Sequence, residues 1–302
     1  MTTQRRLAKD FGSVLVPYWF VVPALAYLSL FMFLPLAHEI GMSRTDAKLT
    51  NPGGGHFIGL RNYRSLFVDA DFYTTLRVTV VYTLSTVVIS VALGIVSALV
   101  VNRAFRGRGI ARAILLLGWA IPSTAAALIW SWMYNEHSGV LNRIVVDFGG
   151  APIPWLRSPH VALAAVVATT VWQATPFVML VILAALQSVP EEVCEAATID
   201  GADRLNAFRA VTWPHIWPSV RVVGLLIAVW SIRRYDIIYL LTGGGPIDST
   251  ATLVVQLRQI AFQGYDLGEA SAYGVIGLIL ALLVASFHYL GERAHTAKGA
   301  RR

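Results

Sequence analysis

The chain consists of apolar runs of about 20 residues, separated by segments that carry most of its charges. A helix of that length crosses the roughly 30 Å hydrocarbon core of a bilayer. Only 14% of the 302 residues are charged, against roughly 25% in soluble domains, and 56% are hydrophobic. A soluble core could not bury this much apolar surface, so we predict an all-α, polytopic membrane protein. Six transmembrane helices are expected, at residues 17–40, 76–101, 110–134, 161–186, 220–241 and 270–290.

The distribution of Lys and Arg predicts the orientation of these helices. Segments on one side of a six-helix arrangement contain 14 Lys and Arg residues, and segments on the other side contain 8. The positive-inside rule then places both termini in the cytoplasm. We expect a cytoplasmic tail at 1–16, a transmembrane domain at 17–290 and a second cytoplasmic tail at 291–302. Topology accounts for the net charge of +7, and without a basic cluster interleaved with aromatic residues no nucleic-acid partner is expected.

A polar interruption, EEVCEAATIDGADRLNAFRAVTWP, lies between the fourth and fifth apolar runs, within a loop at 187–218 on the cytoplasmic side. Ser188 and Glu191 have the spacing of a capping box, which predicts a short helix at about 190–200. The acidic residues that follow suit the positive end of a helix dipole. Gly201 is expected to end this helix.

A second short helix is expected after the glycine. Asp203 can cap it, and Pro214 and Pro218 are expected to end it before the fifth run begins. Leu205 and Phe208 share one face of this helix. That face could pack on the protein's own cytoplasmic ends, or the two helices could form a knob that enters a partner's groove. Spacing alone leaves both alternatives open.

The interruption resembles the EAA loop of binding-protein-dependent ABC importer permeases. Their pattern is E-A-A, three residues, G, nine residues and I-x-L-P, and Glu195, Gly201 and Pro214 match its spacing. Val211 replaces the isoleucine and Trp213 the leucine. The resemblance implies a coupling helix that docks on an ATPase subunit. The residues it assigns to that interface are Glu191, Glu192, Glu195, Ala196, Ala197, Asp200, Gly201, Leu205, Phe208 and Pro214.

Three further stretches resemble the carbohydrate branch of this family: FIGLRNYRSLF at 57–67, the run from Trp172 through the EAA loop, and YDIIYLLTGGGPIDSTATL at 235–253. The resemblance implies a MetI-like permease fold in a bacterial plasma membrane. It implies import of an oligosaccharide, disaccharide or polyol, or alternatively of glycerol-3-phosphate or a glycerophosphodiester. The implied partners are a second permease, an ABC ATPase dimer that binds ATP and Mg²⁺, and an extracytoplasmic solute-binding protein or lipoprotein.

The sequence offers no catalytic or nucleotide-binding set of its own. The glycine clusters at 53–55 and 243–245 lack the Lys and Ser or Thr of a phosphate-binding loop. The histidines lack metal-ligand spacing, and no acid–base pair is evident. We therefore expect a transporter subunit without a cofactor and without enzymatic activity. An ion-coupled secondary carrier is a less favoured alternative, because such carriers hold several ionisable groups near the midplane.

Polar residues inside the expected spans are candidates for the solute path. Arg233, Arg234 and Asp236 form one cluster in the fifth span, either as an internal ion pair or along the path. Trp172, Gln173 and Thr175 precede Pro176 in the fourth span. This second set combines an aromatic ring with amide and hydroxyl groups, as sugar sites do, but it could equally be packing.

Overall fold

The computed structural model describes residues 19–299, without the side chains at 191, 194, 198 and 292–299. The predicted tail at 1–16 lies outside the described residues. Five helices in this range are long and apolar enough to cross a membrane, and the count is six if one bent pair of helices is taken as a single span. The five are Trp19–Met42, Ala70–Asn102, Ala162–Gln187, Arg204–Ile232 and Leu267–Gly291.

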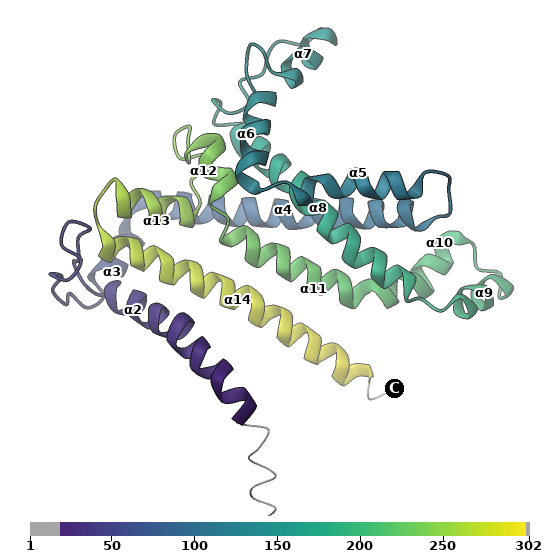
Figure 1. The fold of residues 1–302 in the computed structure, drawn as a ribbon, viewed down its shortest axis with the longest axis horizontal. Helices are drawn as coiled ribbons and strands as arrows, with labels where there is room; N and C mark the ends of the chain where they lie inside the picture. The colour runs from purple at the N-terminus through teal and green to yellow at the C-terminus, as the bar shows by residue number, and fades with distance from the viewer. Residues whose placement is uncertain (1–18, 300–302) are drawn as a thin grey trace, which may run out of the picture.

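The remaining elements are short helices that connect these spans (Figure 1). The first span includes a π-turn η1 (Ser29–Phe33) and α2 (Leu34–Met42), and the others contain α4 (Ala70–Asn102), α8 (Ala162–Gln187), α11 (Trp213–Ile232) and α14 (Leu267–Gly299). The connecting helices are α3 (Arg61–Val68), α7 (Val140–Asp147), α9 (Glu191–Ile199), α10 (Arg204–Ala207), α12 (Asp236–Thr242) and α13 (Leu253–Phe262).

The third apolar run is not the straight helix predicted at 110–134. It forms α5 (Arg108–Ala120) and α6 (Ser123–Met133), which are bent by 100° relative to each other. Pro122 causes the break, because it lacks an N–H and forces the preceding residue out of the α region. Ile121 accordingly adopts an extended backbone, with φ −80° and ψ 128°.

The fifth span also differs from its prediction. It begins at α10, continues through a π-turn, η2 (Phe208–Thr212), and runs along α11 to Ile232. The expectation that Pro214 and Pro218 end a helix is therefore wrong. Pro214 lies in the first turn of α11, where a missing N–H is tolerated, and the wider π-turn before it relieves the crowding of its ring. The helix ends instead at Ile232, with Arg233 as its C-cap, and the next helix, α12, begins at Asp236.

The packed centre of the molecule is the pair α4 and α8. Gly94 permits their close approach, since a Cβ at this position would lie 2.4 Å from Cγ1 of Val178. Toward one end, Tyr82 of α4 is fully buried and its hydroxyl lies 3.0 Å from that of Thr170 on α8. Toward the other end, apolar side chains of α4, α8 and α11 form a cluster around Ile182.

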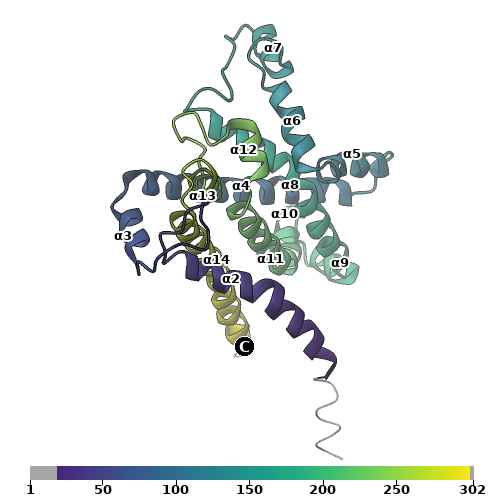
Figure 2. The same cartoon turned by 60° about the vertical axis from the view of Figure 1, so that its left-hand side comes forward.

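The first span lies on the outside of this bundle. It joins the other helices near α2 and extends away from them toward its N-terminal end (Figure 2). No residue of its most apolar 18-residue window is buried. At the opposite extremity, α6 and α7 project from the body formed by the long helices (Figures 1 and 2).

Candidate functional site

Residues 187–218, for which a coupling role is predicted and which we call the coupling loop, project from one end of the molecule (Figure 1). Helix α9 covers 191–199, which confirms the short helix predicted there. Gly201 follows with a φ of +82°, and Ala202 N donates to Ala197 O at 3.0 Å. This left-handed residue ends the helix, as glycine does in many helix C-termini. A side chain at 201 would meet nothing within 4 Å, so the glycine serves the backbone conformation alone.

The two predicted caps have different outcomes. Asp203 caps α10 as expected, because its Oδ1 accepts from Asn206 N at 2.8 Å. The serine half of the capping box is wrong, and the side chain of Glu191, its other half, lies outside the described side chains. Ser188 has the helical backbone of a C-cap of α8, whereas an N-cap needs an extended one. Its hydroxyl donates to Ala185 O at 2.9 Å and lies 3.0 Å from Nε2 of His215, so it links α8 to α11.

The coupling loop exposes both apolar and acidic side chains. Ile199 is 85% exposed, Leu205 55% and Val193 47%. These apolar side chains lack cover from the described residues. The remaining exposed members of the predicted ATPase interface are Glu192, Glu195, Ala196, Asp200, Gly201 and Pro214.

Other members of the predicted interface are less accessible. Ala197 is half-buried, and the side chain of Glu191 lies outside those described. Phe208 is half-buried and lines a cavity of about 760 Å³ between the loop and the ends of α4 and α8. Each of the two alternatives for this helix face therefore holds for one residue. Phe208 packs toward the protein's own body, whereas Leu205 faces outward, as a contact with a partner requires.

Gln173 and Arg234, two predicted solute-path residues, contact each other. Nη1 of Arg234 donates to Oε1 of Gln173 at 2.9 Å, and Nε2 of Gln173 donates to the carbonyl of Ile121 at 3.1 Å. We call these three residues the Arg234 relay. Ile121 lies in the break between α5 and α6, and Arg234 lies in the break between α11 and α12. The relay therefore connects both helix breaks through α8.

The predicted ion pair within the cluster at 233–236 is not formed. The ion pairs among the described residues are Lys48–Asp266, His56–Asp46 and Arg157–Glu136. Asp236 lies instead in the first turn of α12, where the helix dipole favours its charge. Arg233 is exposed and Arg234 donates to a neutral amide, so the internal Arg–Asp pair, one of the two alternatives that the sequence left open, is not formed.

Trp172 and Thr175 lie apart from the Arg234 relay. Both line a groove of about 860 Å³ formed by α4, α5 and α8, with mostly apolar walls. Trp172 packs edge-to-face on Trp130, with ring centroids 5.6 Å apart. The hydroxyl of Thr175 bonds to its own helix at Val171 O, 2.7 Å away. The predicted set of Trp172, Gln173 and Thr175 is thus divided between two faces of α8. Trp172 and Thr175 face the groove, and Gln173 faces the Arg234 relay.

An aromatic cluster on the Gln173 side was missed by the sequence analysis. The cluster consists of Trp119 of α5, Phe177 of α8 and Trp230 of α11. The ring centroid of Trp119 lies 5.0 Å from that of Phe177 and 5.7 Å from that of Trp230, and the centroids of Phe177 and Trp230 are 4.9 Å apart. Phe177 follows Gln173 by one helical turn, so both project from the same side of α8. The three rings come from different helices, and only the position of Trp119 just before Pro122 could have drawn attention to it.

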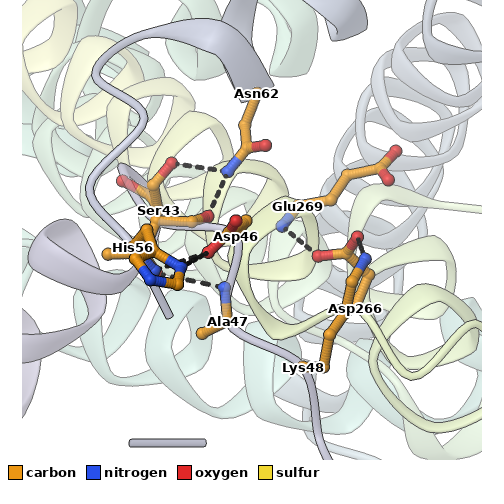
Figure 3. Close-up of polar contacts among 9 residues, drawn as sticks. Ser43, Asp46, Ala47, Lys48, His56, Asn62, Asp266 and Glu269 are labelled. Atoms are coloured by element: carbon orange, nitrogen blue, oxygen red, sulfur yellow. Dashed lines mark hydrogen bonds and ion pairs between the residues drawn. The ribbon is translucent and has the colours of Figure 1, made fainter. Parts of the chain in front are cut away.

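The FIGLRNYRSLF stretch at 57–67 has a structural role, because its Asn62 holds the segment that follows α2 (Figure 3). The side-chain amide of Asn62 donates to the carbonyls of Ser43 and Thr45, both at 2.9 Å, just after α2 ends. Lys48 forms an ion pair with Asp266 (Figure 3). In addition, Leu267 N donates to Ala47 O at 3.0 Å. These contacts, which we call the outer clasp, fix the end of the first span to the corner between α13 and α14.

The 235–253 stretch forms a turn after α12. Gly243 and Gly244 both have positive φ, and Nε2 of Gln259 donates to Gly243 O at 2.9 Å. Arg258 of α13 lies over the ring of Tyr239, 4.3 Å from its centroid. The glycines therefore shape a turn that α13 holds against α12.

Comparison with known proteins identifies the arrangement. Residues 90–295 match the family described as binding-protein-dependent transport system inner membrane component. The chain is 36% identical to the trehalose/maltose transport system permease protein MalF of Thermococcus litoralis over 270 residues, which is 89% of this chain and 90% of that protein. It is 35% identical to the sulfoquinovosyl glycerol transport system permease protein SmoG of Agrobacterium fabrum, over 92% of this chain and 91% of that one.

Among solved structures, a chain of a bacterial alginate ABC transporter, in complex with an alginate pentasaccharide-bound periplasmic protein, has the same fold. Its TM-score is 0.82 at 21% identity, and the match covers 96% of this chain and 98% of that chain. The order of the helices, the projecting loop and the similar proteins all indicate the same family. The chain belongs to the family of binding-protein-dependent transport system inner membrane components and is a multi-pass permease subunit of an ABC importer.

Proposed function

We propose that this chain is one of two permease subunits that together carry a carbohydrate across a prokaryotic plasma membrane, with both termini in the cytoplasm. As a permease it performs no chemistry, and the ATP and Mg²⁺ belong to an ATPase dimer. A solute-binding protein delivers the solute from outside. Relatives named for trehalose/maltose and for sulfoquinovosyl glycerol support a carbohydrate, and the +7 charge distribution supports the orientation.

The observation that carries this proposal is the exposed coupling loop. It presents apolar and acidic side chains that the described residues leave uncovered, at the positions of the EAA pattern. Its second helix continues without interruption through η2 into α11. A push on the loop would therefore move α11 as one body and reach the helix break at Arg233.

The Arg234 relay then extends this motion to the other spans. It joins the α11–α12 break to Gln173 of α8 and to the α5–α6 break at Ile121. Helix breaks inside a membrane are tolerated where neighbouring groups satisfy the freed backbone, and they often line a cavity. We place the solute path beside this relay. The glycerol-3-phosphate alternative is not favoured, since Arg234 contacts a neutral amide.

The coupling function is tested by exchanging one glycine and comparing it with a matched control. Gly201→Ala places a Cβ on a residue with φ +82°, which strains the end of α9 without a steric clash. Gly109→Ala adds the same atom to the first turn of α5, where it also meets nothing within 4 Å and φ is ordinary.

Both variants are reconstituted with the ATPase, the second permease and the solute-binding protein. We expect Gly201→Ala to reduce solute uptake and solute-stimulated ATP hydrolysis several-fold, and Gly109→Ala to leave both unchanged. If Gly201→Ala retains full stimulation and uptake in an assembled complex, the coupling role of the loop is refuted.

A further inference from the structure

We propose that the cavity between the coupling loop and the ends of α4 and α8 binds a phosphate group, held by Arg103 and Arg204. This cavity, of about 760 Å³, is called the basic cavity below. The phosphate belongs to the headgroup of an anionic lipid or to a soluble phosphate. The site is separate from the solute path, and the inference is independent of which solute the complex carries.

The basic cavity forms where two connecting segments of the chain meet. The turn between α4 and α5 lies at the same end of the molecule as the coupling loop (Figure 1). The polar and aromatic residues that line the cavity are Asn102 and Arg103 at the end of α4, Gln187 at the end of α8, and Arg204, Phe208 and Thr212 of the coupling loop. Two arginines that are far apart in the sequence therefore line the same cavity.

Neither guanidinium group is neutralised by the part of the chain that the structure describes. The ion pairs among the described residues all lie elsewhere, and they include neither Arg103 nor Arg204. The end of α4 does not use Arg103 either, because the carbonyl of Val101 accepts from Nη2 of Arg112 at 2.9 Å. Arg103 and Arg204 are both exposed, so their donors are accessible to an anion.

The side chains around the basic cavity suit a phosphate. A guanidinium group presents its N–H donors in a planar fork that matches two phosphate oxygens. A phosphate has enough oxygen atoms to accept from two arginines at once. The amides of Asn102 and Gln187 and the hydroxyl of Thr212 add neutral hydrogen-bonding groups to the same walls.

The apolar part of the cavity suits the rest of a lipid. Leu99, Leu186 and Phe208 line it beside the polar groups, and they offer a surface for glycerol and the first acyl carbons. In the proposed orientation this end of the molecule is cytoplasmic. Basic pockets between transmembrane helices on that side of a membrane bind anionic lipid headgroups.

A bound phosphate would connect the coupling loop to α4. Arg204 is the first residue of α10, which continues through η2 into α11, whereas Arg103 is the C-cap residue of α4. A phosphate shared by the two arginines would hold the coupling loop against the end of α4. Occupancy of the basic cavity would therefore favour one position of the loop relative to the spans.

The alternative is that the arginines serve only to orient the chain in the membrane. The positive-inside rule requires positive charge on the cytoplasmic side but no particular pocket. Arg106 and Arg108 lie just after Arg103 and are exposed as well, but they do not line the basic cavity. The double variant Arg106→Gln/Arg108→Gln therefore removes as much charge as Arg103→Gln/Arg204→Gln and is its matched control.

The experiment measures binding of two probes to the complete complex in neutral detergent micelles. The probes are tail-labelled phosphatidylglycerol and radiolabelled inorganic phosphate, and unlabelled diacylglycerol serves as a phosphate-free competitor. At about 0.3 M salt the Debye length is roughly 6 Å, so we expect the control to change binding less than about 3-fold. We expect Arg103→Gln/Arg204→Gln to weaken binding roughly 100-fold, at about tenfold for each charge-assisted contact.

The two sources of phosphate give different results. Binding of phosphatidylglycerol that is lost in the cavity variant and kept in the control supports a lipid headgroup, and the same pattern with inorganic phosphate supports a soluble ligand. Binding of neither probe, equal losses in both double variants, or full displacement of phosphatidylglycerol by an equal amount of diacylglycerol overturns the proposal.

The outcome is also separable from that of the coupling test. Arg103 lies outside the coupling loop, so Arg103→Gln with Arg106→Gln as its control decides the question if the Arg204 variant fails to assemble. Binding is measured without solute and without ATP. Loss of the phosphate site would leave the proposed transport function standing, and failure of that function would leave the binding result unchanged.

Discussion

Removal of the side-chain amide at the centre of the Arg234 relay gives a measurable loss of stability. Gln173→Leu keeps the size of a side chain that is 5% exposed but removes its hydrogen bonds from Arg234 and to Ile121, together with a long one of 3.5 Å to Oγ of Ser123. Nε of Arg234 is already buried without a partner among the described residues. The substitution therefore leaves the guanidinium with a second donor unsatisfied.

The expected magnitude follows from the kind of bond that is lost. A hydrogen bond to a charged group contributes about 1.5–3 kcal/mol in proteins, and interhelical bonds in membranes average about 0.6 kcal/mol. Because the donor is charged and partly buried, the upper part of this interval applies to the bond from Arg234. The bond to Ile121 is neutral and adds about 0.5–1 kcal/mol. Together these contributions predict that Gln173→Leu lowers the free energy of unfolding by about 3 kcal/mol.

A double-mutant cycle isolates the contact between Gln173 and Arg234. Gln173→Leu, Arg234→Met and the double variant are unfolded in mixed micelles by increasing denaturing detergent, with helix content as the signal. We expect a coupling energy of about 1 kcal/mol or more, because the second substitution removes an interaction that the first has already broken. Additivity within about 0.3 kcal/mol would show that the two side chains do not interact in the folded protein.

Two further substitutions test packing and the outer clasp. Gly94→Val would place its Cβ 2.4 Å from Val178, so we expect loss of the folded protein on size-exclusion chromatography. The control Gly277→Val has nothing within 4 Å of its Cβ and should elute normally. Normal elution of both variants would contradict the close approach of α4 and α8. Asn62→Ala removes two hydrogen bonds after α2, so amide exchange at 43–58 should become several-fold faster. Lys48→Met removes an exposed ion pair worth less than about 1 kcal/mol and should change that exchange little. A larger increase in exchange for Lys48→Met than for Asn62→Ala would refute this account of the outer clasp.

Local patterns predicted the local elements. The apolar runs located the five long apolar helices and the bent pair α5–α6, because the thickness of the bilayer fixes the length of a helix that crosses it. Asp203 and Gly201 were identified because capping and left-handed conformations depend on one residue and its neighbours. Prolines were harder to interpret. Pro122 breaks its helix, whereas Pro214 follows a π-turn and Pro176 and Pro218 lie inside continuous helices, so a proline alone does not mark the end of a helix.

Contacts between distant helices were not predictable in the same way. The sequence placed Gln173 and Arg234 among the solute-path candidates, but their contact joins residues 61 positions apart. Asp236 follows Arg234 closely in sequence, which made an ion pair one of two alternatives, yet α11 ends at Ile232 and Asp236 lies in the first turn of α12. The aromatic cluster of Trp119, Phe177 and Trp230 combines single residues of three helices, and no local spacing marks such a cluster.

The most direct test of coupling is a cross-link between the loop and an ATPase subunit. Ile199 is 85% exposed at the end of α9, so Ile199→Cys in a Cys194→Ser background offers one reactive thiol on the loop. A photoactivatable reagent on that thiol should join this chain to the ATPase, with a yield that changes when ATP binds. Cross-linking to lipid or to the second permease alone, in a complex that retains ATP-driven uptake, would contradict the account.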